Sequence, residues 1–267
     1  MDFVAFQNNI IPKESLNFYS LERFRYADAC FESILYINGK FPLLSYHQER
    51  LDTTANLLAF QPYHISEALL FDLLQKNALG HKSARLRLSL IRKSGHNYCP
   101  IGEETQVLIE AMPTNLPTFS SINKLGIFRD FTKAKNKFSS IKSASALGYV
   151  MAKKYAAEQA LDDVLVANTE GEWIEASSSN IFAVKDGLIY TSADDSACVH
   201  GVVRSFIIKH FPVTFTSFDL GFLLAADEIF LTNGINLVQK VLKFEGKSLE
   251  NRLSREIQEK MKTLLLI

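Results

Sequence analysis

Residues 162–191, DDVLVANTEGEWIEASSSNIFAVKDGLIYT, carry short apolar runs separated by turn signals. The dipeptides Glu-Gly at 170–171 and Asp-Gly at 186–187 favour turns, and the second is typical of a β-hairpin. The stretch therefore predicts strand, turn, strand and hairpin. Glu175 ends one apolar strand, where a carboxylate needs a partner if it is buried, because burying a bare charge is costly. From the local pattern alone, a strand end in solvent is the simpler interpretation.

The segments that follow predict two helices and a strand. GVVRSFIIKHF (201–211) predicts a short helix and DEIFLTN (227–233) a strand. SLENRLSREIQEKMKTLLLI (248–267) predicts a closing helix. Its apolar stripe is more typical of packing than of function; the stripe consists of Leu249, Leu253, Ile257 and Met261.

The N-terminal part predicts a sheet with two helices. ACFESILYING (29–39) predicts a strand that runs to an Asn-Gly hairpin turn. SYHQERLDTTANLLAF (45–60) predicts a helix that Ser45 caps, with Gln48 three residues on. A second helix is expected over 65–80, ending near Gly80. ARLRLSLIRKSG (84–95) and TQVLIEAM (105–112) then predict paired strands.

PTNLPTF (113–119) is the best linker candidate, since it carries two prolines. The expected fold is therefore α/β (α+β) with two domains: a smaller one over 1–112 and a larger one over 120–267. Ligand sites often form at such junctions.

Composition limits the function classes. The 267 residues carry 29 basic and 29 acidic side chains, which gives no support for nucleic-acid binding. The three cysteines suggest neither a disulfide framework nor a zinc site, and no stretch has the length of a membrane span. We expect a cytoplasmic protein with no nucleic-acid or membrane partner.

Lys142 stands among small residues in SSIKSASALGYVMAKKYAAEQ (139–159). Most lysines are solvated, so the stretch alone favours an ordinary residue at a helix start. The other interpretation is an amine in a tight pocket that forms a Schiff base with a carbonyl, where small neighbours leave room for a ligand.

Two further signals point to an anion. Gly201 precedes a helix start, whose N–H groups suit a phosphate or carboxylate, although many such glycines only make a turn. Arg50 could bind an anion, or its side chain could be solvated on the surface of its helix. With Lys142 and Glu175, these residues form the set that pyridoxal phosphate (PLP) needs: an amine, phosphate donors and an acid for the ring nitrogen. The sequence lacks H-E-x-x-H, G-x-S-x-G, G-x-G-x-x-G and P-loop motifs, so we expect no metal site.

The order of these pieces resembles the class IV (fold-type IV) PLP enzymes, which include branched-chain and D-amino-acid aminotransferases and aminodeoxychorismate lyase. The similarity runs from YADACFESILYINGKFPLLSYHQERL to DEIFLTNGINLVQKV, and its most specific part is IK at Lys142 followed by E-x-x-x-S-N-I-F from Glu175. The resemblance implies a two-domain fold with PLP in the interdomain cleft, and a homodimer.

Carried over by position, the resemblance makes Lys142 the catalytic Schiff-base lysine and proton shuttle, and Glu175 the acid that keeps the ring nitrogen protonated. It implies that the phosphate is bound by one arginine, two backbone N–H groups at a helix start and a second turn: Arg50, Val202, Val203, Thr232, Asn233 and Gly234. Asn180 would support the strand of Glu175, and Arg87 is a candidate substrate contact.

The resemblance leaves two reactions open. A 4-amino-4-deoxychorismate lyase of the folate pathway, which releases pyruvate and forms 4-aminobenzoate, is favoured by the short chain and by SASAL (143–147), where branched-chain enzymes carry Gly-Gly-Asn-Tyr. The alternative is a class IV aminotransferase acting on branched-chain or other amino acids, which Arg87 and FES (31–33) favour. A non-catalytic relative that binds a ligand is the third interpretation; it has no need for Lys142 and Glu175 together.

Overall fold

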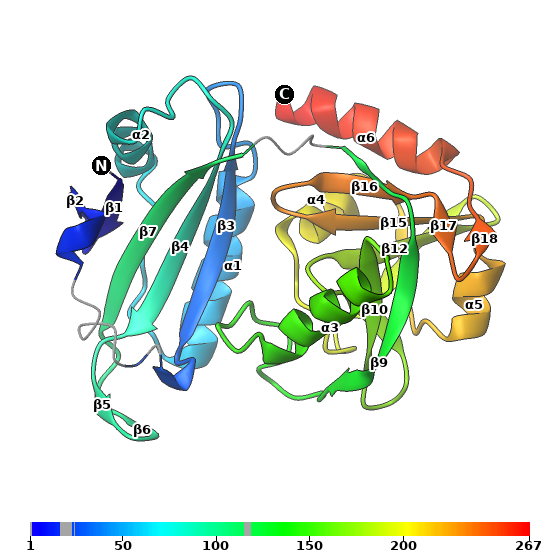
Figure 1. Cartoon of the computed structure of the whole chain (residues 1–267), viewed down its shortest axis with the longest axis horizontal. Helices are drawn as coiled ribbons and strands as arrows, with labels where there is room; N and C mark the ends of the chain where they lie inside the picture. Colours follow the sequence, from blue (N-terminus) through cyan, green and yellow to red (C-terminus); the bar gives the residue numbers. More distant parts are fainter. Residues whose placement is uncertain (1, 17–22, 24, 115–118) are drawn as a thin grey trace. The chain divides into compact units, whose positions relative to one another are not determined.

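The computed structural model describes residues 2–16, 23, 25–114 and 119–267 (Figure 1). The chain divides into two compact units. The first unit consists of Met1–Asn115, Ile141–Ser145 and Ile267, and the second of Leu116–Ser140 and Ala146–Leu266. Among the described residues, no helix is both long and apolar enough to cross a bilayer.

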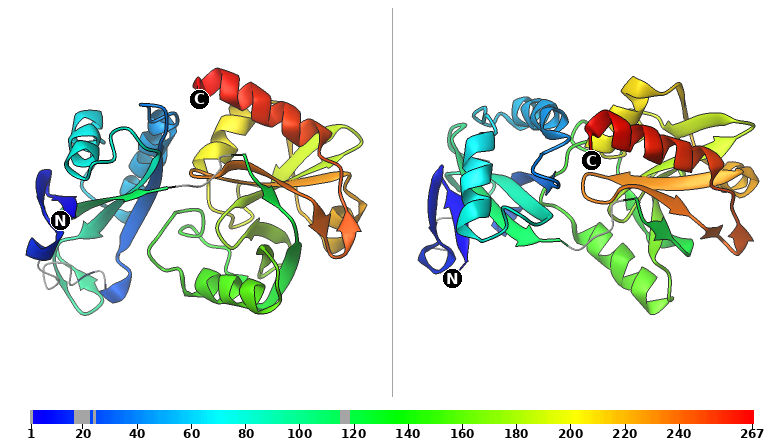
Figure 2. Two further views of the ribbon diagram at one scale, coloured as in Figure 1. Left: turned by 45° about the horizontal axis from the view of Figure 1, so that its top comes forward. Right: turned by 90° about the horizontal axis from the view of Figure 1, so that it is seen from above.

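The first unit is an antiparallel sheet with the strand order β2-β1-β7-β4-β3 and two helices on one face (Figure 2). The predicted pairing of the strands over 84–95 and 105–112 is confirmed. The elements of this unit are β1 (Phe3–Phe6), β2 (Asn9–Pro12), η1 (Lys13–Ser15), β3 (Ala29–Tyr36), α1 (Leu44–Leu58), α2 (Glu67–Lys76), β4 (Ala84–Arg92), β5 (Gly95–His96), β6 (Cys99–Pro100) and β7 (Thr105–Pro113).

Alternation along the strands places one set of side chains against the helices. Leu86, Leu88 and Leu90 of β4 pack with Leu51 of α1 and Leu70 of α2 in one buried cluster. The odd-numbered positions of β3 and β4 therefore face the other side of the sheet, and Phe31 and Arg87 are among them.

Three local predictions in this unit need correction. Ser45 does not cap α1, which begins at Leu44 without a side-chain cap; the Gln48 side chain instead accepts the N–H of Ile65 at 2.8 Å. The turn at 38–39 forms, but it closes a single bridge before the chain enters α1, and β3 pairs with β4. The second helix ends at Lys76, before Gly80, and Ser66 caps its start.

The second unit contains an eleven-stranded mixed sheet. The order along its main path is β18-β17-β9-β10-β11-β12-β15-β16-β8, with β13 on β12 and β14 on β13. Its elements are β8 (Ser121–Ile122), β9 (Leu125–Lys133), α3 (Leu147–Glu158), β10 (Asp163–Asn168), β11 (Trp173–Ala176), β12 (Asn180–Lys185), β13 (Leu188–Ser192), α4 (Val202–His210), β14 (Val213–Thr216), α5 (Leu220–Ala225), β15 (Glu228–Asn233), β16 (Leu237–Val241), β17 (Lys243–Phe244), β18 (Lys247–Ser248) and α6 (Arg252–Leu265).

The predicted strands and hairpin over 162–191 are confirmed as β10 to β13. Helices cover the sheet because its strands are apolar on both faces. Val164 and Val166 pack with Ala152 and Ala156 of α3, while Leu165 of the same strand joins a cluster with Leu223 of α5. In α6, the stripe predicted from the sequence is buried at Ile257 and Met261.

The division of the chain differs from the one expected at 113–119. The first unit extends to Asn115, and Ile141–Ser145 returns to it instead of remaining with residues 120–267. The physical reason is a pair of backbone hydrogen bonds that extend the sheet beyond β3. The N–H of Phe31 donates to the Lys142 carbonyl at 3.0 Å, and the N–H of Ala144 donates to the Ala29 carbonyl at 2.9 Å.

Candidate active site

One row of residues across the second unit's sheet places three candidate side chains on one face. Glu175 of β11 lies opposite Asn180 of β12, and Asn180 lies opposite Thr232 of β15. Residues directly opposite in paired strands point to the same face. Val166, opposite Glu175, packs under α3, so this is the face that α3 covers.

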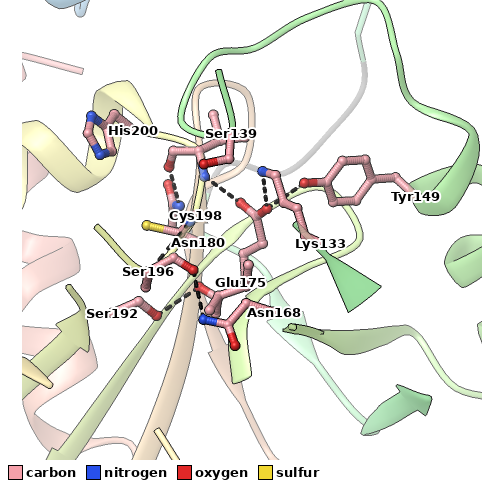
Figure 3. Close-up of polar contacts among 12 residues, drawn as sticks. Lys133, Ser139, Tyr149, Asn168, Glu175, Asn180, Ser192, Ser196, Cys198 and His200 are labelled. Atoms are coloured by element: carbon pink, nitrogen blue, oxygen red, sulfur yellow. Dashed lines mark hydrogen bonds and ion pairs between the residues drawn. The ribbon is translucent and has the colours of Figure 1, made fainter. Parts of the chain in front are cut away.

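Glu175 is buried, with 3% of its surface exposed, and donors surround its carboxylate (Figure 3). Oε1 accepts from Lys133 Nζ at 2.8 Å and from the Tyr149 hydroxyl at 2.5 Å. Oε2 accepts the backbone N–H of Val199 at 2.8 Å. A carboxylate has about four acceptor sites, so these three bonds leave capacity for one more donor. The exposed strand end that the local pattern favoured is therefore wrong.

Tyr149 comes from the first turn of α3, and its hydroxyl keeps its proton. Burial raises the pKa of Tyr149, and the neighbouring charge of Glu175 raises it further. At neutral pH the phenol is thus a fixed donor to Glu175. Burial likewise raises the pKa of the nearby Cys198 thiol, which makes it an unreactive neighbour.

The start of α4 offers unused backbone donors. Gly201 occupies the N-cap position and no side chain caps the helix, so the N–H groups of Val202 and Val203 have no partner within the helix. A Cβ atom on Gly201 would lie 2.0 Å from Oδ1 of Asn180. The Asn180 amide is held in that place by a 2.6 Å bond from Nδ2 to the Val199 carbonyl. The glycine therefore permits a close approach between β12 and the helix start.

The turn after β15 adds a second polar feature. Thr232 is buried, and its Oγ1 has no hydrogen-bond partner within the described part of the chain. Asn233 folds the turn, since its Oδ1 accepts the N–H groups of Ile235 and Asn236 at 3.0 and 2.8 Å. Gly234 lies inside this turn. A buried hydroxyl without a partner is costly, so Thr232 is suited to a bound ligand group.

In the first unit, Lys142 lies beside one aromatic residue, Phe31, which also contacts the cationic side chain of Arg87. Its Nζ is 4.5 Å from the centre of the Phe31 ring, and the Arg87 guanidinium carbon is 3.8 Å from the same centre. These contacts are of the cation–π type. Burial lowers the pKa of Arg87, and the like charge of Arg85 adds to that effect. The structure thus brings Lys142 and Arg87 together on Phe31.

Arg50 lies in a buried ionic cluster on the other face of β3, since successive residues of a strand point to opposite faces. Its Nε donates to Oε1 of Glu32 at 2.8 Å, and its Nη2 binds Oε2. His47 Nδ1 also contacts Oε2, at 2.6 Å. Burial opposes the charge of Glu32, but Arg50 and His47 prevail and lower its pKa to about 2. Burial lowers the pKa of His47, so its neutral ring donates from Nδ1.

Sequence reasoning identified Glu175 but missed its partners. Lys133, Tyr149 and Val199 come from three separate segments, and no spacing links them to Glu175. Glu32 was also missed, although it lies in the same strand as Phe31 and a buried glutamate in an apolar strand is the kind of signal that singled out Glu175.

The chain belongs to the class IV aminotransferase family. The family model "Amino-transferase class IV" matches residues 29–244. The chain is 30% identical over 215 residues to a "Probable branched-chain-amino-acid aminotransferase" of Rickettsia bellii, covering 78% of this chain and 73% of that protein. It is 27% identical over 259 residues to the D-alanine aminotransferase of Listeria monocytogenes, covering 91% of this chain and 88% of that protein.

Solved structures show the same fold. The branched-chain aminotransferase of Thermoproteus uzoniensis superposes with a TM-score of 0.86 at 20% identity, over 99% of this chain and 95% of that one. A Legionella pneumophila protein provisionally assigned as a 4-amino-4-deoxychorismate lyase gives 0.81 at 24% identity, over 95% and 96%. At these identities the likeness concerns the fold alone. The expected fold-type IV architecture is confirmed.

Enzymes of this family use PLP, and the residues present fit this cofactor. Glu175 has capacity for one further donor, as a protonated ring nitrogen would provide. The start of α4, which no side chain caps, offers donors to a phosphate, and so does the Thr232 hydroxyl, which has no partner among the described residues. The chain is thus a PLP-dependent enzyme of class IV.

Proposed function

We propose that this enzyme is an aminotransferase that moves the amino group of an amino acid to a keto acid. The buried carboxylate of Glu175 supports PLP chemistry at this site, because its donors leave it one acceptor site for the ring nitrogen. The aminotransferase relatives favour amino-group transfer over elimination. A protonated ring nitrogen makes bound PLP an electron sink for the substrate α-carbon.

Each candidate residue has a role in this proposal. Lys142 would provide the amine that holds PLP and would carry the proton to and from the substrate α-carbon. Arg87, beside Lys142 on Phe31, binds the substrate carboxylate. The phosphate is assigned to the donors of the second unit, which are Val202, Val203, Thr232, Asn233 and Gly234. The resemblance adds Arg50 of the first unit, whose guanidinium pairs with Glu32 in this structure.

The sequence favoured the lyase over the aminotransferase, and the comparisons support the opposite order. The family match and both relatives named above are aminotransferases by description. The names of the two relatives give different substrates, so we propose the donor as a class: a small or branched-chain amino acid. The lyase reaction becomes an outcome of the test.

The test follows the visible absorption of the PLP-loaded protein while L- and D-amino acids are added one at a time. Conversion to the pyridoxamine form, reversed by a keto acid, is the expected result. Lys142→Ala should abolish it, whereas Lys153→Ala, a change at an exposed lysine of α3, should not. A spectrum unchanged by every amino acid, together with pyruvate release from 4-amino-4-deoxychorismate without an acceptor, would establish the lyase instead.

Two broader expectations belong to the same proposal. A homodimer follows from the resemblance, and sedimentation velocity tests it through the mass of the particle. A cytoplasmic location agrees with three cysteines that are all free thiols, since a reducing compartment keeps them so. Fractionation of the source cells tests that location.

A further inference from the structure

Strand β9 contains a bulge that changes its register against β10. Phe128 lies opposite Val166, yet the next residue of β10, Ala167, lies opposite Thr132. Three residues of β9, 129–131, are therefore extra in this pair of parallel strands. A bulge redirects the side chains that follow it. Lys133 directly follows Thr132, so the bulge sets the direction of the Lys133 side chain.

One of the extra residues, Phe131, is packed in place. The ring of Phe131 lies 5.8 Å from the ring of Tyr149, centre to centre, at 71°. A Cβ atom on Gly148 would lie 2.4 Å from Cζ of Phe131, so only a glycine permits this approach at the start of α3. The bulge thus fixes β9 against the helix turn that carries Tyr149.

Lys133 and Tyr149 meet on one oxygen of Glu175 (Figure 3). Lys133 Nζ also lies 5.4 Å from the Tyr149 ring centre. Among the donors to Glu175 in the described part of the chain, Lys133 is the one that carries a charge. Its side chain is 13% exposed and that of Glu175 is 4%, whereas the ion pair of Lys154 with Glu158 is 59% and 54% exposed. Removing one partner of a buried pair leaves an uncompensated charge, which removal from a surface pair does not.

We infer that Lys133 is a positioning residue for the cofactor: it holds Glu175 as an oriented carboxylate whose remaining acceptor site meets the ring nitrogen. This inference rests on the proposed role of Glu175. Lys133 occupies Oε1 together with Tyr149, and Val199 fixes Oε2, so the carboxyl group cannot rotate. Without the ammonium, the buried carboxyl would be charged and unpaired, or would take up a proton and lose its acceptor geometry.

The experiment measures the dissociation constant of PLP through quenching of the single tryptophan, Trp173, which lies two residues before Glu175 in β11. Lys133→Met should raise the constant about tenfold or more, and Lys133→Arg should keep it within about threefold of the parent. Lys154→Met is the matched control, since it breaks an exposed ion pair in the same unit, and it should change nothing. Melting temperatures of the cofactor-free proteins show that each variant is folded.

A double-mutant cycle tests whether Lys133 changes PLP affinity through Glu175. If Lys133 acts through Glu175, the loss caused by Lys133→Met should vanish in a Glu175→Gln background. An equal loss in both backgrounds, or affinity in Lys133→Met equal to the parent, would overturn the inference. If the parent itself failed to bind PLP, the proposed function would fall. In that case the same double-mutant cycle, measured on the unfolding free energy of the cofactor-free proteins, would test whether Lys133 and Glu175 are coupled. Additive effects of the two substitutions would refute the coupling.

Discussion

Replacing Glu32 with glutamine tests the ionic cluster that holds Arg50. Glu32 is buried and accepts from His47 and Arg50, whose charge brings its pKa from 4.5 to about 2. A difference of this size corresponds to about 3 kcal/mol of stability at neutral pH. Because the folded-state pKa lies below the unfolded value, this stability is complete above about pH 5 and is lost as the pH falls toward 2.

Glu32→Gln should therefore lower the unfolding free energy of the first unit by about 3 kcal/mol at pH 7. Near pH 3 the wild-type protein has lost about 60% of the same contribution, so the difference in unfolding free energy between the two proteins should shrink accordingly. Urea unfolding curves, read by mass spectrometry after a short deuterium pulse, separate the first unit from the second. The informative peptides cover 29–36 and 84–92, which are buried strands of the first sheet.

The control is Glu104→Gln, which removes an exposed carboxylate whose pKa is lowered by its hydrogen bond to Lys93. It should leave the unfolding curve of the first unit almost unchanged, because solvent screens an exposed pair. A loss in Glu32→Gln that is the same at pH 3 and pH 7, or one below about 1 kcal/mol at pH 7, would refute the assignment of stability to the ionised cluster.

Three further changes probe other parts of the molecule. Gly201→Ala should weaken PLP binding at least fivefold, because the new Cβ atom would displace the Asn180 amide; fluorescence titration measures this, and parent-like affinity would contradict the tight approach. Ser66→Ala removes the cap that accepts the Leu69 N–H and should cost about 1 kcal/mol of first-unit stability by the same pulse method, whereas no change would show that water replaces the cap. Ile257→Ala, at a fully buried position of α6, should lower second-unit stability by about 2 to 4 kcal/mol in urea unfolding, and a loss below about 1 kcal/mol would indicate a loosely packed helix.

The fold was predictable from the sequence where periodicity and turn dipeptides agree. The strands over 162–191 combine apolar runs with turns at Gly171 and Gly187, both of which have the positive φ that favours glycine. The start of α1 was not predictable in the same way. Ser45 matches a capping pattern, yet the Gln48 side chain binds the Ile65 N–H, a tertiary contact that local pattern cannot show.

The candidate site likewise contains residues that the sequence identifies and residues that only the tertiary structure shows. Lys142 and Glu175 were assigned through the order of the segments that match the family, because each local pattern alone favoured an ordinary solvated residue. Lys133 stands in a charged stretch, KAKNK, that reads as solvated surface. Its burial beside Glu175 depends on the bulge in β9, which is visible only in the pairing of β9 with β10. The burial of Lys133 is therefore explained by the strand register of β9 and cannot be predicted from the composition of the stretch.

The return of Ile141–Ser145 to the first unit has a consequence for synthesis on the ribosome. The N-terminal unit cannot complete its sheet edge when Asn115 has emerged, because the segment that bonds to β3 is made thirty residues later. Until then the outer edge of β3 has unpaired backbone groups, which are a template for wrong pairing. Domains generally fold as they emerge, N-terminal first. In this chain the edge of the N-terminal sheet is completed only after part of the second unit has been made, and the segment that completes this edge carries Lys142.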